Sequence, residues 1–272
     1  MQWWCSAQTA AWTWSWQPYP GVWIFVLVLA VLYWAVRRKW ETDTSPERGR
    51  WLRLASFYAA LVCLWAALDW PVGALGAGYL ASAHMVQFLL IALVSPPLLL
   101  FAVPPKVFDS LAARSTVVSF LRVLTNPLIA LAFFNIVLVA THWPSIVDGL
   151  MSSQWGSFAL DMAWWGGGLV LWWPIVAPVP QRPRFTYMYK IGYLILATIL
   201  NTPAFALLTF SDLPLYATFE LAPPVSGMSS RVDQRVAGLL MKIGGGLIFW
   251  TAITVLFARW YMAEQAQEDA VS

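Results

Sequence analysis

The feature that most constrains this sequence is a series of seven apolar stretches, separated by segments that carry most of its charges. The stretches cover approximately residues 21–36, 54–70, 79–103, 127–141, 157–177, 187–210 and 236–261. A helix needs roughly 17–25 mostly apolar residues to cross a bilayer. Because 60% of the residues are hydrophobic and only 11% are charged, one globular core could not cover this surface. The sequence therefore predicts an all-α, polytopic membrane bundle of seven transmembrane helices, forming a single domain over residues 1–272.

The positions of lysine and arginine predict how this bundle is oriented. With the N-terminus outside, thirteen basic residues fall on the inner side and two on the outer side. The inner set is Arg37, Arg38, Lys39, Arg48, Arg50, Arg53, Lys106, Arg114, Arg122, Arg182, Arg184, Lys190 and Arg259, and the outer set is Arg231 and Arg235. Cytoplasmic segments carry such an excess. We therefore expect a polar outer N-terminal segment (1–19), an N-terminus outside and a C-terminus in the cytoplasm.

Two polar segments are expected on the cytoplasmic side. Residues 104–126 can form an amphipathic helix on the membrane surface, because their apolar and basic side chains separate onto two faces. The apolar face has Phe108, Leu111, Val118 and Leu121, and the basic face has Lys106, Arg114 and Arg122. The C-terminal tail (262–272) is polar, and we expect it to be frayed from Glu264 onward.

The candidate site lies at the outer end of the predicted bundle, where polar residues of five segments share one depth. The two histidines, His84 and His142, lie there, and Asp161 lies about one turn into the fifth stretch. Charged groups inside membrane helices are costly and are usually paired or functional. Imidazole suits copper, zinc or iron, and the thioether of Met85 suits Cu(I). The possible ligands are thus His84, His142, Asp161 and Met85, with Asp233, Gln87 and Asp69 as possible supporting groups.

Each of these residues also has a purely structural interpretation. A histidine at a helix end can be an interfacial hydrogen-bonding residue, and a methionine beside it can serve packing alone. Asp69 and Asp233 can be helix-terminal groups, since a carboxylate before a helix start suits the helix dipole. No pair of these residues has a strict metal-ligand spacing such as His-x-x-x-His.

Other classes of function have little support in the sequence. There is no basic stripe with interleaved aromatic residues, so we expect no nucleic-acid partner. There is no phosphate-binding loop or nucleophile motif, so we expect neither an enzyme nor a small-molecule substrate. The glycine triplets at 166–168 and 244–246 are interpreted as close helix contacts. A transporter would need polar groups at mid-depth, for which Asn201 with Pro203 is the nearest candidate.

Several segments resemble the CtaG family of cytochrome c oxidase assembly factors. They are YLASAHMVQ (79–87), SPPLL (95–99), HWP (142–144), GLVLWWP (168–174), DQRVAGLLM (233–241) and WQPYP (16–20). They occur in the family's order over almost the whole chain. The resemblance implies a multi-pass protein of the bacterial cell (inner) membrane. It also implies a metallochaperone-like role, in which copper is delivered to the catalytic subunit of a haem–copper oxidase from the outer face.

The sequence departs from the family pattern at two positions. Phe88 stands where the family commonly has a second histidine, four residues after the one matched by His84. Asp161 occupies a position that is commonly histidine near the start of the fifth helix. A carboxylate there could act as a harder ligand for copper. The alternative is a metal-free structural or interaction subunit of a membrane complex, whose partners are oxidase subunits or other membrane proteins, with lipid around it.

Overall fold

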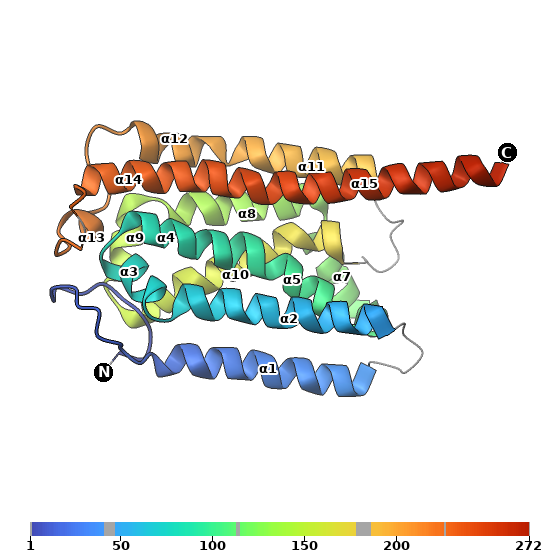
Figure 1. Cartoon of the computed structure of the whole chain (residues 1–272), viewed down its shortest axis with the longest axis horizontal. Helices are drawn as coiled ribbons and strands as arrows, with labels where there is room; N and C mark the ends of the chain where they lie inside the picture. Colours follow the sequence, from blue (N-terminus) through green and yellow to red (C-terminus); the bar gives the residue numbers. More distant parts are fainter. Residues whose placement is uncertain (1, 41–46, 113–114, 178–185, 226, 272) are drawn as a thin grey trace.

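The computed structural model describes residues 2–40, 47–112, 115–177, 186–225 and 227–271, and within these ranges it contains helices and no strand. The helices run side by side in one elongated bundle, with the two termini at opposite ends (Figure 1). The predicted all-α architecture is therefore confirmed.

Long helices, some continued by a second segment, form the body of the bundle. Along the chain they are α1 (Pro20–Trp40), α2 (Glu47–Leu68), α4 (Ala81–Phe88) with η1 (Leu89–Val94) and α5 (Ser95–Ala102), α8 (Pro127–Thr141), α10 (Gln154–Val176), α11 (Tyr187–Leu200) with α12 (Thr202–Phe210), and α14 (Ser230–Leu239) with η2 (Leu240–Gly244) and α15 (Gly245–Val271). The run from α4 to α5 is central and largely buried, whereas α1 is peripheral and exposes most of its apolar side chains. That exposure suits a helix that faces lipid.

By length and composition, five of the described helices can cross a membrane. They are Pro20–Trp40, Glu47–Leu68, Ala81–Ala102, Tyr187–Phe210 and Ser230–Asp269. The pair α8 and α9 (Pro144–Met151), bent by 72°, would count as a sixth span if taken together. Helix α10 has 23 residues, enough for a span, but is not among these five. The bundle is thus that of a multi-pass membrane protein.

The central helix changes its winding before a pair of prolines. Pro96 and Pro97 lie in the first turn of α5 and have no N–H to donate to the preceding turn. The residues before them, η1, form a wide π-helical turn, and the hydroxyl of Ser95 donates to the carbonyl oxygen of Ile91 at 3.1 Å. This change of winding lets the helix remain continuous past the prolines.

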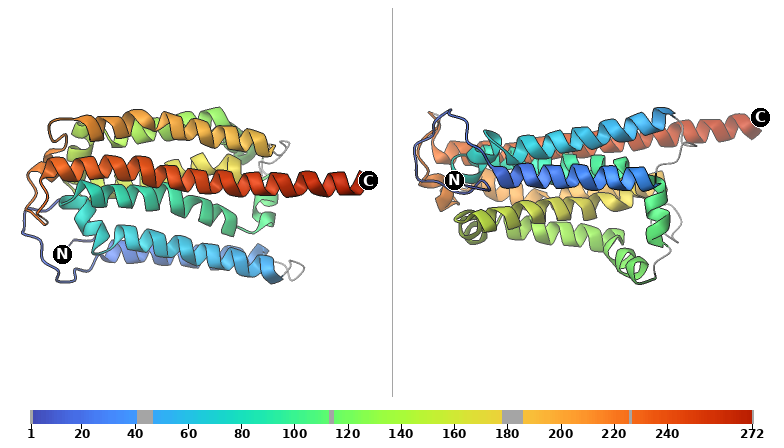
Figure 2. Two further views of the ribbon diagram at one scale, coloured as in Figure 1. Left: turned by 45° about the horizontal axis from the view of Figure 1, so that its top comes forward. Right: turned by 90° about the horizontal axis from the view of Figure 1, so that it is seen from below.

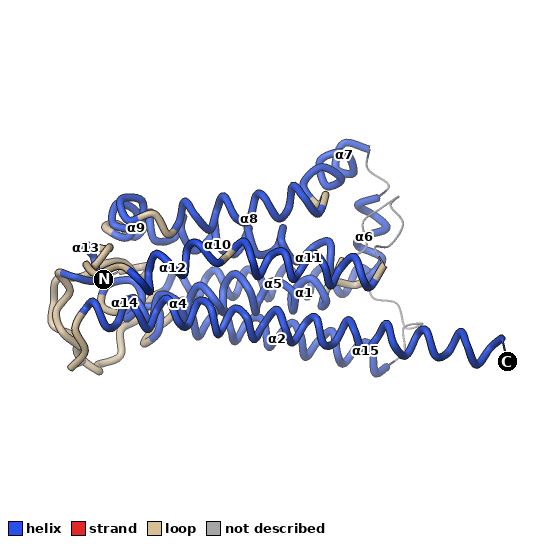
Figure 3. The backbone as a smooth tube through the Cα atoms, turned by 90° about the horizontal axis from the view of Figure 1, so that it is seen from above, coloured by secondary structure: helices blue, strands red, loops and turns tan. Residues whose placement is uncertain are grey.

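Short elements close the end of the bundle that holds the N-terminus. They are α3 (Val72–Gly78), α9 and α13 (Ala217–Glu220), and several loops lie at the same end (Figure 3). The predicted polar outer segment is in fact anchored by burial, since Trp4, Cys5 and Tyr19 are almost fully buried. The backbone N–H of Ala7 donates to the carbonyl oxygen of Met151 at 3.0 Å. The hydroxyl of Tyr79 donates to the backbone carbonyl oxygen of Ala10 at 2.9 Å.

The opposite end differs from the sequence predictions in two respects. The expected single amphipathic helix is divided into α6 (Pro105–Ala112) and α7 (Ser115–Leu124), which lie across the bundle end (Figure 2). Phe108 faces the bundle, with its ring 5.7 Å from that of Trp173, while Phe120 is exposed. The tail expected to be frayed continues α15 as a helix to Val271, beyond the rest of the bundle.

Four residues on which the sequence predictions rest are not described by the structure, or not in their side chains. Arg114, Arg182 and Arg184 fall outside the described ranges, and the side chain of Val118 is not described.

Candidate functional site

His84 lies in the first turn of α4 and is 5% exposed. Its ring is 4.8 Å from the ring of Trp164 and 5.5 Å from that of Phe219, both measured between centroids. Neither ring nitrogen makes a well-formed hydrogen bond to a described residue. The backbone of Gly76 and the side chain of Gln87 lie beside the ring as hydrogen-bonding groups of less favourable geometry, and the ring of His142 lies within electrostatic reach. A buried imidazole without a well-formed hydrogen bond is costly.

His142 ends α8 and is 4% exposed. Its Nδ1 lies 2.8 Å from the carbonyl oxygen of Leu138. A carbonyl oxygen only accepts, so Nδ1 carries the hydrogen and Nε2 keeps its lone pair. Nε2 is buried and makes no hydrogen bond to the described part of the chain. Histidines that bind a metal through one ring nitrogen commonly donate from the other nitrogen to a carbonyl oxygen in this way.

The phenol of Tyr216 holds the backbone of this histidine, because its hydroxyl donates to the carbonyl oxygen of His142 at 2.9 Å. Burial raises the pKa of Tyr216, and the charge of Asp148 raises it further. The hydroxyl therefore remains a donor at neutral pH. Asp148 itself accepts from the N–H groups of Ala217 and Thr218 at 3.1 and 2.9 Å, which fastens α13 over this end.

Trp164 of α10 lies near both histidines. Its ring centroid is 4.8 Å from that of His84 and 6.1 Å from that of His142. Its indole N–H donates to the hydroxyl of Thr141 at 2.9 Å, which orients the ring. Phe88 lies 5.1 Å from His142 and 5.4 Å from Trp164. Both imidazoles are therefore buried in an aromatic environment around Trp164.

Asp161 is also buried, and its partner comes from the N-terminal segment. The indole N–H of Trp4 donates to its carboxylate at 2.7 Å. The thiol of Cys5, next in the chain, donates to the carbonyl oxygen of Leu68 at 3.2 Å. Burial raises the pKa of Cys5 well above its ordinary value, and the charges of Asp161 and Asp69 raise it further. The thiol therefore stays protonated and suits a hydrogen-bond donor better than a thiolate ligand.

The three residues predicted as supporting groups make hydrogen bonds that position helices. Asp233 accepts from the N–H groups of Ala81 and Ser82 at 2.6 and 3.3 Å, and from the Ser82 hydroxyl, so it caps the start of α4. The side-chain amide of Gln87 donates to the carbonyl oxygen of Ala67 at 2.9 Å.

Asp69 is surrounded by tryptophans. It accepts from the indole N–H groups of Trp23 and Trp65 at 2.9 and 2.7 Å, and from the backbone N–H of Trp70 at 2.9 Å. These bonds connect α1 and α2 at the end of the bundle where the histidines lie.

The predicted ligands therefore divide into separate environments. His84 and His142 each lie near Trp164, Asp161 is bonded to Trp4, and Met85 is buried in the core. Within the described ranges, no three residues among His, Cys, Asp and Glu form a group that could hold a metal ion. Metal binding by these residues stays a prediction.

Sequence reasoning missed Trp164, Tyr216 and Trp4. Trp164 follows Asp161 by three residues and so shares its helix face, which is a signal that could have been used. Trp4 and Tyr216 lie in segments without helical periodicity, and the sequence contains no indication of their remote partners.

An all-helical bundle with several apolar helices of membrane-spanning length defines the class: this is a multi-pass membrane protein. Comparison with known families is more specific. The model of one family, the cytochrome c oxidase caa3 assembly factors (Caa3_CtaG), matches residues 29–263 of this chain. The chain belongs to this family, and the resemblance seen in the sequence is confirmed. No curated protein and no solved structure matches the chain.

Proposed function

We propose that this protein is an accessory factor in the assembly of a haem–copper cytochrome c oxidase, and that it helps to deliver copper to the catalytic subunit. Membership of the assembly-factor family supports the first part and favours a role without catalysis of its own. The buried histidines His84 and His142 support the second part. Both ring nitrogens of His84, and Nε2 of His142, make no well-formed hydrogen bond to the described residues.

Copper is the cargo in this proposal, and the donor set suits transfer. Two imidazoles leave a copper ion with an incomplete ligand set, which a ligand from the receiving oxidase subunit can complete. Met85 or Asp161 would be the third ligand within this chain, after a change in side-chain conformation. For Asp161, such a change would cost the charge-assisted hydrogen bond from Trp4.

Copper binding can be measured directly on the purified protein under anaerobic conditions with Cu(I). We expect about one copper ion per chain. The double replacement of His84 and His142 by alanine should abolish binding. Met85→Leu should weaken binding if the thioether is a ligand. Met151→Leu is the matched control, because Met151 is equally buried and lies outside the proposed ligand set.

Two results would contradict the copper role. One is a wild-type protein that binds no copper at micromolar free Cu(I), and the other is unchanged copper in the double histidine variant. Either would favour the metal-free interaction subunit. Co-purification with an oxidase at fixed stoichiometry would then be expected for wild type and histidine variants alike.

We further propose seven membrane crossings, with the N-terminus and the histidine pair on the outer side. The termini lie at opposite ends of the bundle, as an odd number of crossings requires (Figure 1). Helix α10, with 23 residues, is about 35 Å long, which suffices for a bilayer core of about 30 Å. The end opposite the histidines carries Arg37, Arg38 and Lys39 in the last turn of α1, in agreement with the positive-inside rule.

Reporter fusions test this orientation. A fluorescent protein that folds only in the cytoplasm should fluoresce at the C-terminus, and alkaline phosphatase should be inactive there. The same two reporters at the N-terminus should give the reverse pattern. An active phosphatase at the C-terminus would mean that the topology is inverted or that the number of crossings is even.

A further inference from the structure

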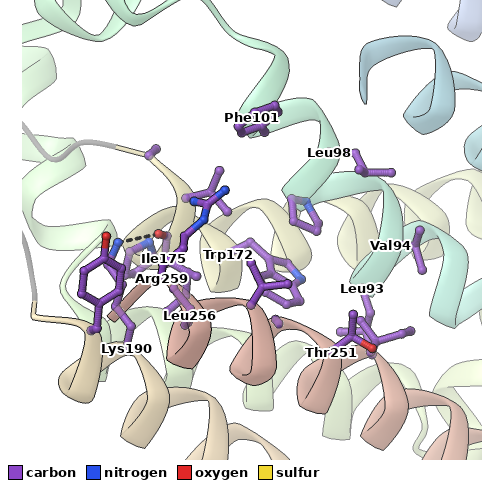
Figure 4. A pocket seen from close by; sticks show the side chains of 18 of the residues that line it. Leu93, Val94, Leu98, Phe101, Trp172, Ile175, Lys190, Thr251, Leu256 and Arg259 are labelled. Carbon is purple, nitrogen blue, oxygen red and sulfur yellow. Dashed lines mark hydrogen bonds between the residues drawn. The ribbon is translucent and has the colours of Figure 1, made fainter. Parts of the chain in front are cut away.

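A large cavity lies far from the histidine pair, near the end of the bundle where α11 begins. Its volume is about 910 Å³, and it opens between η1 and α5 on one side and α15 on the other, with α10 behind it and the start of α11 at its end (Figure 4). Its walls are mostly aliphatic and aromatic. Trp172 and Ile175 of α10 form the back, and Phe101 of α5, which is 42% exposed, lies at the rim.

The cavity is charged at one end. Lys190, in the first turn of α11, and Arg259, on α15, both line it there. The ammonium of Lys190 donates to the carbonyl oxygen of Ile175 at 2.7 Å, which holds the side chain at the cavity (Figure 4). Neither aspartate nor glutamate occurs among the described residues that line the cavity. The site therefore combines a long apolar groove with a cationic end.

We propose that this cavity binds an anionic phospholipid, with the phosphate at Lys190 and Arg259 and an acyl chain along α15. Basic pockets between transmembrane helices are suited to anionic headgroups. The proposal does not depend on the copper role, because the two sites share no residue.

The dimensions of the groove agree with this occupant. The residues of α15 that line it recur on one helix face from Leu247 to Arg259, a rise of about 18 Å. One leaflet of hydrocarbon is about 15 Å deep, half of the bilayer core. The apolar face of α15 in the cavity therefore matches the length of one acyl chain of a phospholipid.

Lipid retention by the purified full-length protein tests the proposal. The protein is exchanged into detergent with phosphatidylglycerol or phosphatidylcholine, and bound lipid is counted by native mass spectrometry. We expect phosphatidylglycerol to be retained preferentially. The double variant Lys190→Gln/Arg259→Gln should lose about tenfold of that preference. The matched control Arg38→Gln/Lys106→Gln, which removes two exposed cations outside the cavity, should behave as wild type.

A second variant tests the apolar part without changing charge. Ala252→Trp places an indole in the groove and should abolish retention of both lipids. If this variant does not fold, the charge variants still decide the matter. Equal retention of the two lipids by wild type, no retention, or unchanged preference in Lys190→Gln/Arg259→Gln would overturn the proposal. A photo-crosslinker at Ala252 that captures a protein in membranes in place of lipid would also overturn it.

Discussion

Replacing Asp233 with alanine is expected to lower the free energy of unfolding by about 3–5 kcal/mol. The carboxylate is 2% exposed and accepts from the N–H groups of Ala81 and Ser82 and from the Ser82 hydroxyl. Alanine would leave these donors without an acceptor at the start of α4, directly before His84. The measurement is unfolding in mixed micelles titrated with dodecyl sulfate, followed by circular dichroism.

Two further variants at this end provide controls. Asp233→Asn keeps one acceptor oxygen in place and should cost less, about 1–2 kcal/mol. Asp212→Ala removes a largely exposed carboxylate that pairs with Arg231 at 2.5 Å, and it should cost less than about 1 kcal/mol. If Asp233→Ala were no more destabilising than Asp212→Ala, the cap would contribute little to folding. Asp233 would then be available for another role.

The second large effect is expected at Gly168, where α10 passes the central helix. A Cβ atom there would lie 2.7 Å from Cγ of Pro96 and 2.9 Å from the carbonyl carbon of Ala92. Neither a proline ring nor a backbone carbonyl can move away cheaply. Gly168→Ala should therefore destabilise the protein by about 1–3 kcal/mol, measured by the same titration.

The glycine triplet contains its own control. A Cβ at Gly166 would meet nothing within 4 Å. Gly166→Ala should therefore stabilise α10 by about 0.5–1 kcal/mol, because alanine is the better helix former. Equal effects at the two positions would show that the close approach of α10 to Ala92 does not limit stability.

These glycines show which part of a helix contact can be predicted from the sequence and which part cannot. The sequence predicted close helix contacts at both triplets, and Gly168 confirms the prediction. The triplet by itself does not tell which member makes the contact. That depends on the rotation of α10 about its axis, which is decided by the packing of the whole bundle.

The aspartates illustrate the same limit at the candidate site. The sequence placed Asp69, Asp161 and Asp233 near one depth of the bundle. Depth along a helix follows from counting residues, whereas the direction of a side chain around the helix depends on its neighbours. Trp4, which donates to Asp161 from 157 positions away in the chain, belongs to a segment with no periodicity to predict its place.

The helical bundle and its family were determined by the sequence alone. A chain this apolar must satisfy its backbone hydrogen bonds internally in a bilayer, which favours helices. Tertiary structure decided what the polar residues do. It placed both histidines beside Trp164, bonded Asp161 to Trp4 and Asp233 to the start of α4, and left an apolar cavity with a cationic end beside α15. The physical reason is that hydrophobicity acts without direction, whereas hydrogen bonds and ring contacts require particular partners at short distances.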